Sequence, residues 1–202
     1  VNVEAAPLGD GYWRVTIVAY DYPGELSLIC GLLFAYGFSI QDGEVFTYER
    51  IDSPAWGDTE TGAAAWKDTR RKIVDVFTVR RVGQDSVTPE TWAQYADDLA
   101  GLLQTMHAGQ RRAARGDLAK RIAAVLEEAD HTPTPLYPVD IEIDNTASEH
   151  YTVLRIDAPD TVGFLYEFTN ALAFNRIYIA RVSVDSIGSR VRDILYVTDA
   201  DG

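Results

Sequence analysis

The sequence predicts an α+β protein built from two copies of one small ferredoxin-like β-α-β-β-α-β domain, with antiparallel sheets that carry their helices on one face. The first observation is a pair of matching turns. Asp21-Tyr22-Pro23-Gly24-Glu25-Leu26 and Asp160-Thr161-Val162-Gly163-Phe164-Leu165 each open an apolar segment, at an offset of 139 residues. The second observation is that strand and helix signals recur in one order around both turns. In a chain of 202 residues, such a repeat indicates two small domains.

The first copy opens with a strand and a helix. Trp13 to Tyr20 alternates apolar and polar residues, as a half-buried strand does. Pro23-Gly24 breaks this strand, and the apolar residues of Glu25 to Tyr36 recur at the spacing of one helical face. Gly37 is expected to end the helix in the left-handed conformation.

Two further strands follow, Phe38 to Arg50 and Lys72 to Val82. They are joined by Ile51 to Arg71, a polar and Gly-rich segment that contains Trp56 and Trp66. In the second copy the tight hairpin turn Ile187-Gly188-Ser189 takes its place. The 51–71 loop is therefore predicted to be an insertion into the shared fold.

Two helices are predicted after these strands. Thr88 caps the first, with Pro89 in its first turn, and this helix runs to about Thr105. Leu118 to Ala129 forms the second. The intervening Gly109 to Gly116 is predicted to be a connection, whose arginines (Arg111, Arg112 and Arg115) are solvated or contact a partner.

The domain boundary is placed at a proline-rich spacer. His131 to Pro138 contains three prolines and is expected to be stiff. We therefore expect a first domain over 1–138, with the 51–71 insertion and an extra helix over 117–130, and a second domain over 139–202.

Each copy needs one more strand to complete a four-stranded sheet. The candidates are Val1 to Glu4 and Val139 to Asp144. Which copy each completes stays open at this stage. If Val139 to Asp144 closes the first sheet and Val1 to Glu4 the second, the exchange ties both copies into one rigid body.

Composition excludes several classes of function. The net charge of -13 disfavours nucleic acid and anionic membrane surfaces as partners. No apolar run approaches the roughly 20 residues that cross a bilayer, and no signal peptide is recognisable, so a cytoplasmic location is expected. Cys30 stands alone among apolar residues and is expected to be a buried hydrophobe. Because the chain begins at Val1 and ends where another helix is expected, we expect a piece of a longer polypeptide.

No catalytic, metal or cofactor site is predicted. His107, His131 and His150 have no cysteine or carboxylate at metal-ligand spacing. Nucleophile elbows and phosphate-binding glycine loops are absent from the sequence. The final Asp199-Ala200-Asp201-Gly202 is interpreted as a polar turn, because the other ligands of a calcium loop are missing.

The strand-to-helix turns are the candidate ligand sites. A helix that starts directly after a sharp turn leaves backbone amides free to bind a carboxylate, and Gly24 and Gly163 leave room for one. Alternatively, each glycine merely permits a positive φ. Asp21 and Asp160 either cap their helices or hold the ammonium of a bound amino acid. Asp75 and Asp193 are interpreted as solvated positions on the polar faces of their strands.

These motifs resemble the ACT domain, a small regulatory module that binds amino acids. In the first copy the resemblance rests on Asp21-x-Pro23-Gly24-x-Leu26 and Val74-Asp75-x-Phe77-x-Val79. The second copy is more specific. Its Ala158-Pro159-Asp160, Gly163-Phe164-Leu165-Tyr166-Glu167-Phe168 and Asp193-x-x-Tyr196-Val197-Thr198-Asp199 resemble the C-terminal ACT pair of bacterial PII uridylyltransferases.

The resemblance implies a non-catalytic regulatory pair that senses glutamine and controls a nucleotidyltransferase acting on the signalling protein PII. The enzymatic domains would lie upstream. It implies a ligand between the turn of one copy and the strand of another, without a cofactor. The implied ligand-binding residues are Asp21, Gly24, Glu25, Leu26, Ile40, Gln41, Asp160, Val162, Gly163, Phe164, Leu165, Ile177, Tyr178 and Ile179.

The chain also departs from the family pattern. Val162 replaces the usual proline, and the second copy is read as two residues shorter between Asp160 and Ile177, with Asn175 where Gly37 stands in the first. Glu25 is expected to repel a ligand carboxylate and to impair the first pocket.

Two rival functions remain from sequence. One is a free-standing ACT-repeat regulator without an attached enzyme. The other is an interaction module that binds no small ligand and forms a homodimer through exposed sheet edges or faces.

Overall fold

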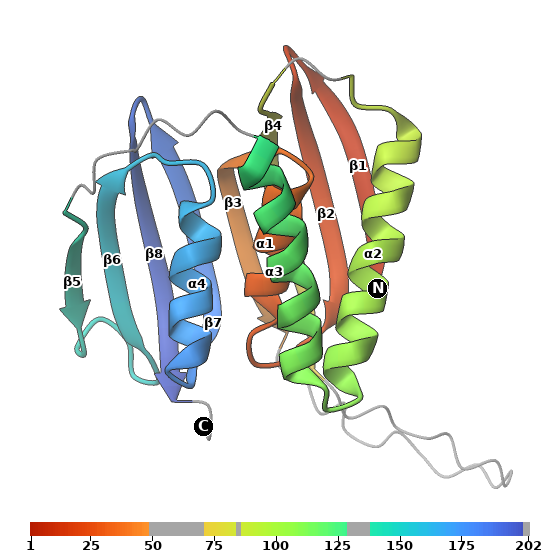
Figure 1. The fold of residues 1–202 in the computed structure, drawn as a ribbon. Coiled ribbons are helices and arrows are strands. Elements are labelled where there is room, and N and C mark those ends of the chain that lie inside the picture. The colour runs from red at the N-terminus through yellow and green to blue at the C-terminus, as the bar shows by residue number, and fades with distance from the viewer. Residues whose placement is uncertain (49–70, 84–85, 129–137, 200–202) are drawn as a thin grey trace, which may run out of the picture.

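The computed structural model describes residues 1–48, 71–83, 86–128 and 138–199 (Figure 1). The predicted 51–71 insertion and 131–138 spacer therefore lie almost wholly outside the described residues. The elements follow the order β1 (Asn2–Gly9), β2 (Tyr12–Tyr20), α1 (Glu25–Ala35), β3 (Phe38–Tyr48), β4 (Lys72–Arg81), α2 (Pro89–His107), α3 (Arg111–Glu128), β5 (Asp140–Asp144), β6 (Thr152–Pro159), α4 (Phe164–Phe174), β7 (Ile177–Ile187) and β8 (Arg190–Asp199).

The eight strands form one antiparallel sheet in the order β1-β2-β4-β3-β7-β8-β6-β5. Its first four strands belong to the first copy and its last four to the second, and the four helices lie on one face (Figure 1). The predicted α+β class with two ferredoxin-like halves is confirmed. None of the described helices is long and apolar enough to cross a membrane.

Strand exchange between the copies does not occur. β1 pairs with β2, and β5 pairs with β6, so each closing strand completes its own copy. The reason is local: Asp10 and Gly11 adopt positive φ in a tight turn that returns the chain directly onto β2. A hairpin closes a short loop and so costs less chain entropy than pairing with a distant strand.

The two halves are joined by β3 and β7, which meet around a local twofold axis. Glu44 pairs with Ser183, and these residues occupy equivalent positions at the offset of 139. Asp42 pairs with Asp185 and Phe46 with Arg181, as twofold symmetry requires. The Ser183 hydroxyl donates to Glu44 Oε1 at 2.6 Å. The repeat in the sequence is therefore a symmetry of the sheet.

The second copy is not shorter than the first. The offset of 139 holds from the start of α1 and α4 through the start of β3 and β7, so Arg176, with φ 59°, stands where Gly37, with φ 70°, ends the first helix. Sequence comparison placed Ile177 opposite Ile40, which was wrong by two residues. Strand residues alternate with a period of two, so a slip of two positions preserves the apolar pattern.

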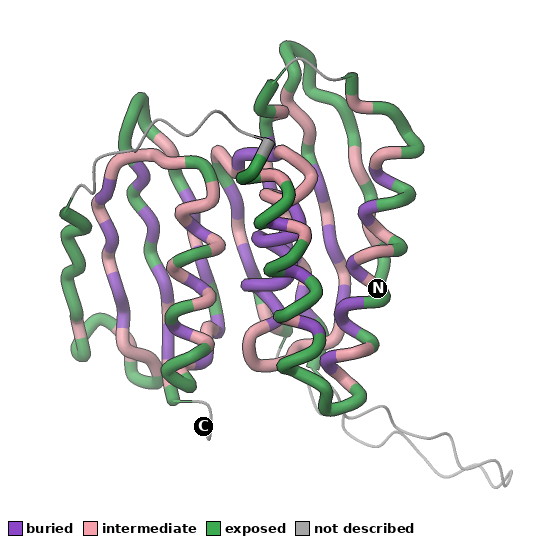
Figure 2. Tube along the Cα trace, viewed as in Figure 1, coloured by how far each residue is buried: buried purple, intermediate pink, exposed green. Residues whose placement is uncertain are grey.

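Helix α1 is buried on nearly all sides (Figure 2), although a single apolar face was predicted. It packs on β3 and contacts α2, α3 and α4. A Cβ on Gly31 would lie 2.7 Å from the Tyr166 ring and 2.8 Å from Leu118, so this glycine permits α3 and α4 to approach closely.

Helix α2 follows its predicted start closely. The Thr88 amide donates to Thr91 Oγ1, Pro89 is the first helical residue, and the helix ends at His107. Trp92 packs between Trp13 and Phe38 and thereby holds α2 on the sheet.

Helix α3 is longer than predicted. It begins at Arg111, so the arginines assigned to a connection are helical. Ala114 is fully buried and extends the apolar stripe of Leu118 by one turn, while Gly116 is exposed and tolerated. Arg121 and Tyr36 both bind the Asp98 carboxylate, which links α3, α1 and α2.

Candidate functional site: two pockets between the halves

Two equivalent pockets lie where the glycine turn of one half meets the central strand of the other. Pocket A lies between the Gly24 turn and β7, and pocket B between the Gly163 turn and β3. Their cavity volumes are about 30 Å³ for pocket A and about 20 Å³ for pocket B, and both pockets open to solvent at their mouths. Pockets A and B are thus each built from both halves.

Most of the predicted site residues line one of these pockets. Pocket A contains Asp21, Gly24, Glu25, Leu26, Ile177, Tyr178 and Ile179. Pocket B contains Ile40, Asp160, Gly163, Phe164 and Leu165. Two predicted residues line neither: Gln41 lies in a β-bulge and donates to Ser39 Oγ, while Val162 is 48% exposed.

Sequence reasoning missed the residues supplied by the pocket floors and by the neighbouring helix. In pocket A these include Asp75, Thr169 and Ala173. Their equivalents in pocket B are Asp193, Cys30 and Phe34. The offset of 139 relates Cys30 to Thr169 and Phe34 to Ala173. Extending the alignment of the two copies along both helices could therefore have identified these residues.

Both glycine turns have the geometry needed to expose helix amides. Gly24 and Gly163 precede their helices with φ of 89° and 87°. The Glu25 amide donates back to Tyr22 O, and the Phe164 amide to Thr161 O. The next amides of each first turn have no acceptor within their helix, and their residues line the pockets. They provide an anion site together with the positive end of the helix dipole.

Asp21 and Asp160 do not cap their helices, since neither N-cap has a side-chain hydrogen bond. Asp21 instead accepts a hydrogen bond from the Tyr178 hydroxyl at 2.7 Å and pairs with Arg71 Nε at 3.0 Å. The Asp160 carboxylate has neither a hydrogen bond nor an ion pair among the described residues, and only the backbone amide of this residue is bonded, to Ser189 O at 2.8 Å. Burial raises the pKa of Asp160, and Arg80 opposes this shift. Of the two equivalent carboxyl groups, one is already engaged and one is available.

Asp75 and Asp193 are not solvated, which corrects the interpretation from sequence. Their exposed fractions are 0% and 1%. Asp75 shares its strand face with buried Ile73, Phe77 and Val79. The apolar Val74 and Val76 lie on the other face, so both faces of this strand are mainly apolar. The sequence therefore does not indicate which face the helices cover.

Pocket A contains a second buried acid. The Tyr22 amide donates to Glu25 Oε2 at 3.1 Å, and burial, with Asp75 and Asp21 nearby, raises the pKa of Glu25 to about 9. Burial and Asp21 also raise the pKa of Asp75. Glu25 therefore holds a proton at neutral pH and is uncharged, so the repulsion of a ligand carboxylate that the sequence predicted requires Glu25 to ionise first.

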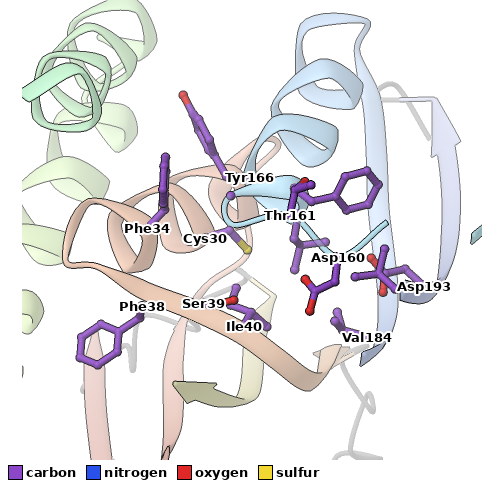
Figure 3. Close-up of a pocket in the computed structure, with 14 residues that line it drawn as sticks. Cys30, Phe34, Phe38, Ser39, Ile40, Asp160, Thr161, Tyr166, Val184 and Asp193 are labelled. Atoms are coloured by element: carbon purple, nitrogen blue, oxygen red, sulfur yellow. The ribbon is translucent and has the colours of Figure 1, made fainter. Parts of the chain in front are cut away.

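Pocket B has a less crowded set of charges. Burial raises the pKa of Asp193 to about 7, and the amide of Asp185 opposes this shift. Phe164 occupies the position of Glu25. In Figure 3, the carboxylate of Asp160 lies between Ser39 and Asp193. Pocket B thus has two acidic groups near a helix N-terminus, with an apolar residue beside them.

The opposing walls also differ. Tyr178 in pocket A corresponds to Ser39 in pocket B, and Ala173 corresponds to Phe34. A Cβ on Gly163 would lie 3.3 Å from the Phe34 ring, whereas one on Gly24 would lie 2.9 Å from Arg115 Nη2 of α3. Helix α3 therefore adds a cation beside pocket A.

The arrangement does not favour metal chemistry. Within the described ranges, no three histidine, cysteine or acidic side chains are grouped so that they could hold a metal ion. His107 stacks on Tyr22, with ring centroids 3.8 Å apart. What the pockets offer is carboxyl groups on one side and helix amides on the other.

No protein-family model matches this chain. Among curated proteins it is similar to three bifunctional uridylyltransferase/uridylyl-removing enzymes. The identity is 41% with that of Cereibacter sphaeroides over 94% of the chain, 32% with that of Rhodopseudomonas palustris over 94%, and 32% with that of Bradyrhizobium sp. (strain ORS 278) over 100%. The chain spans 17%, 18% and 19% of these relatives' lengths.

Among solved structures, aspartate kinase from Synechocystis aligns with 95% of the chain and 25% of its own length, at 15% identity and a TM-score of 0.41. That likeness is too distant to bear on function. The curated relatives agree with the motifs described above. Over essentially its full length, the chain is similar to a segment of the bifunctional uridylyltransferase/uridylyl-removing enzymes.

Proposed function

We propose that this chain is the regulatory amino-acid-binding region of an enzyme of the uridylyltransferase/uridylyl-removing type, and that glutamine binds in pocket B. The observation that carries the proposal is the construction of the pocket. A helix N-terminus and an unengaged carboxylate from one half face a strand from the other half, so a single ligand contacts both.

Pocket B offers a partner for each charged group of an amino acid. The amides of Leu165 and Tyr166, in the first turn of α4, suit the ligand carboxylate. Asp160, with no ion pair among the described residues, suits the ammonium group, and Asp193 is poised to ionise beside it. Ser39 and the Ile40 segment form the opposing wall, where a polar ligand side chain can donate or accept.

Pocket A is less suited to the same ligand. Asp21 is engaged by Tyr178 and Arg71, so an ammonium group would have to displace existing contacts. Glu25 occupies the position beside the glycine where Phe164 stands in pocket B. We therefore assign amino-acid binding to pocket B.

Regulation follows from the contact with both halves. A ligand that bridges the Gly163 turn and β3 stabilises one arrangement of the two halves over others. The activity of an attached enzyme can change only to the extent that the ligand binds these arrangements with different affinities. A coupling of about 1–3 kcal/mol would be ordinary.

In this proposal the first domain covers 1–138 and the second covers 139–202. Nucleotidyltransferase domains lie upstream, PII is the protein that they modify, and the protein is located in the cytoplasm.

The direct test is a calorimetric titration with glutamine, with glutamate and glycine as comparators. Glutamine alone is expected to bind saturably. Asp160→Asn should abolish this binding, while the matched variant Asp21→Asn in pocket A should leave it intact. Absence of heat with folded wild-type protein, or equal losses in both variants, would contradict the assignment.

A second candidate function rests on the face of the sheet that carries no helices. Phe46, Tyr48 and Ile194 are between 36% and 60% exposed there. Such residues suit a homodimer or interaction module that needs no ligand. Sedimentation analysis that showed a dimer without glutamine, together with a silent titration, would favour this function.

A further inference from the structure

Pocket A contains buried acceptor atoms that nothing in the described structure satisfies. Glu25 is 2% exposed and Asp75 is fully buried. Glu25 Oε1 and both Oδ atoms of Asp75 have no hydrogen-bond partner among the described residues. Buried polar atoms are normally paired, because leaving one unpaired costs about 1–3 kcal/mol. The described residues therefore leave hydrogen-bonding capacity of both carboxyl groups unused.

The nearby donors are directed elsewhere. Tyr178 and Arg71 both bind Asp21. Arg115 lies beside Gly24, with its guanidinium carbon 4.6 Å from the centre of the Phe174 ring. The one described donor to Glu25, the Tyr22 amide, binds Oε2 and leaves Oε1 unpaired. Among the described residues, no other side chain or amide therefore donates to Asp75 or to Oε1 of Glu25.

The missing donor is better supplied by N–H groups than by a metal ion. In the described part of the chain, no three histidine, cysteine or acidic side chains form a group that could hold a metal ion. An ammonium group carries several donors in divergent directions and can reach acceptors that are set apart. Once a bound cation has ionised Glu25, that residue would repel a ligand carboxylate beside the glycine turn, whereas pocket B presents Phe164 at that position.

We propose that pocket A binds a small cation that carries an ammonium group and no carboxylate, with its N–H groups donating to Glu25 and Asp75. Ammonium itself and small primary amines share this chemistry. The high burial of both acids limits the ligand to a small one. This site is distinct from the amino-acid site proposed for pocket B and does not depend on it.

Binding should exchange a proton for the cation. Burial, together with Asp75 and Asp21, raises the pKa of Glu25 to about 9, so Glu25 is protonated at pH 7 before a cation binds. A bound cation stabilises the ionised form and releases that proton. The other charged or titratable groups around the site include Arg71 before β4, Tyr178 on β7, Tyr22 in the turn, His107 on α2 and Arg115 on α3. The N-terminal amino group also acts on Glu25, and Cys30 and Tyr95 lie near Asp75.

The test is titration of the 202-residue chain with ammonium chloride and methylammonium chloride at pH 7, with potassium chloride and tetramethylammonium chloride at equal ionic strength as controls. Calorimetry in buffers of different ionisation enthalpy reports the released proton. Saturable binding by either N–H cation, with proton release and no response to either control salt, is expected. A response to the ammonium ion but not to methylammonium would identify the free ion as the ligand.

Variants locate the site. Glu25→Gln should weaken binding at least about tenfold, as loss of a hydrogen bond to a charged group does, and should abolish proton release. Asp75→Asn should also weaken binding and serves if the first variant does not fold. The matched variant Asp193→Asn in pocket B should change neither. No saturable binding by wild type, an equal response to potassium, or unaltered binding by both folded pocket A variants would overturn the proposal.

The outcome is separable from that of the amino-acid titration. Glutamine binding that survives Glu25→Gln with no ammonium response would leave pocket B intact as the amino-acid site and reject the cation site. Ammonium binding without any glutamine response would support the cation site in pocket A and reject pocket B as the amino-acid site.

Discussion

Pockets A and B share a backbone and differ in chemistry. Each combines a left-handed glycine, a helix N-terminus, an aspartate after a strand and a second aspartate on the floor. In pocket A the position after the glycine is Glu25 and the opposing hydroxyl belongs to Tyr178. In pocket B these positions hold Phe164 and Ser39. The repeat therefore preserved the parts of the site that the backbone supplies and changed the side chains that select a ligand.

The difference shows that equivalent geometry does not imply an equivalent ligand. Helix amides are present wherever the turn folds, because they belong to the backbone. The free charge, by contrast, depends on what each side chain already contacts. Asp21 is engaged and Asp160 is not, although both occupy the same place in their turns.

The largest expected effect comes from a substitution at the centre of the sheet, at a position where the two halves differ. Gly43 corresponds to buried Val182, and a Cβ on Gly43 would lie 2.4 Å from the Phe77 ring. Gly43→Val should therefore cost about 3 kcal/mol of unfolding free energy through overpacking. Chemical denaturation would measure it.

The second half suggests the rescue for this variant, because Val182 pairs there with Leu195, the equivalent of Phe77. Phe77→Leu in the Gly43→Val background should recover part of the loss. A double variant whose destabilisation equals the sum of the two single variants would show that these positions do not compensate each other.

The next largest effect is a pH dependence of stability that distinguishes Glu25 in pocket A from Asp193 in pocket B. Folding raises the pKa of Glu25 from its ordinary 4.5 to about 9, so the folded state retains a proton that the unfolded chain releases. Wild-type stability should fall as pH rises through this window. For Asp193 the pKa in the folded state is about 7, so this residue makes stability fall only up to about pH 7. Between pH 7 and 9, Glu25→Gln should remove a decline of about 2 kcal/mol, whereas Asp193→Asn should not.

Urea denaturation of the wild type and both variants across this pH range measures the slopes. An unchanged slope in Glu25→Gln would mean that Glu25 does not hold its proton in the folded state.

A smaller effect concerns the hydroxyl groups on the opposing strands. Tyr178→Phe removes the hydrogen bond to Asp21 and should cost about 1 kcal/mol. Ser39→Ala, its equivalent in pocket B, removes an acceptor for Gln41 and should cost less than Tyr178→Phe. Thermal unfolding compares the two, and equal costs would indicate that the Tyr178–Asp21 contact does not distinguish the pockets.

The smallest effect lies on the local twofold axis. Ser183→Ala removes the hydroxyl that donates to Glu44 and should cost about 0.5 kcal/mol, because this contact is only partly buried. Glutamine binding in pocket B should be unchanged in this variant. A marked change in affinity would show that the axis contact also sets the spacing of the two halves.

The sequence by itself determined the repeat, the two glycine turns, the strands and helices around them, and the tight turn at Gly188. These features depend on local patterns, since positive φ favours glycine and apolar spacing reports which residues face a core. The Thr88 cap was predictable for the same reason.

Other features were decided by tertiary structure alone. Whether Asp75 is solvated depends on which face of the sheet the helices cover, and a strand of mainly apolar residues does not reveal this. Residues from opposite halves meet in each pocket because β3 pairs with β7, a contact between segments distant in sequence. Engagement of Asp21 by Tyr178 depends on that pairing, which no local pattern encodes.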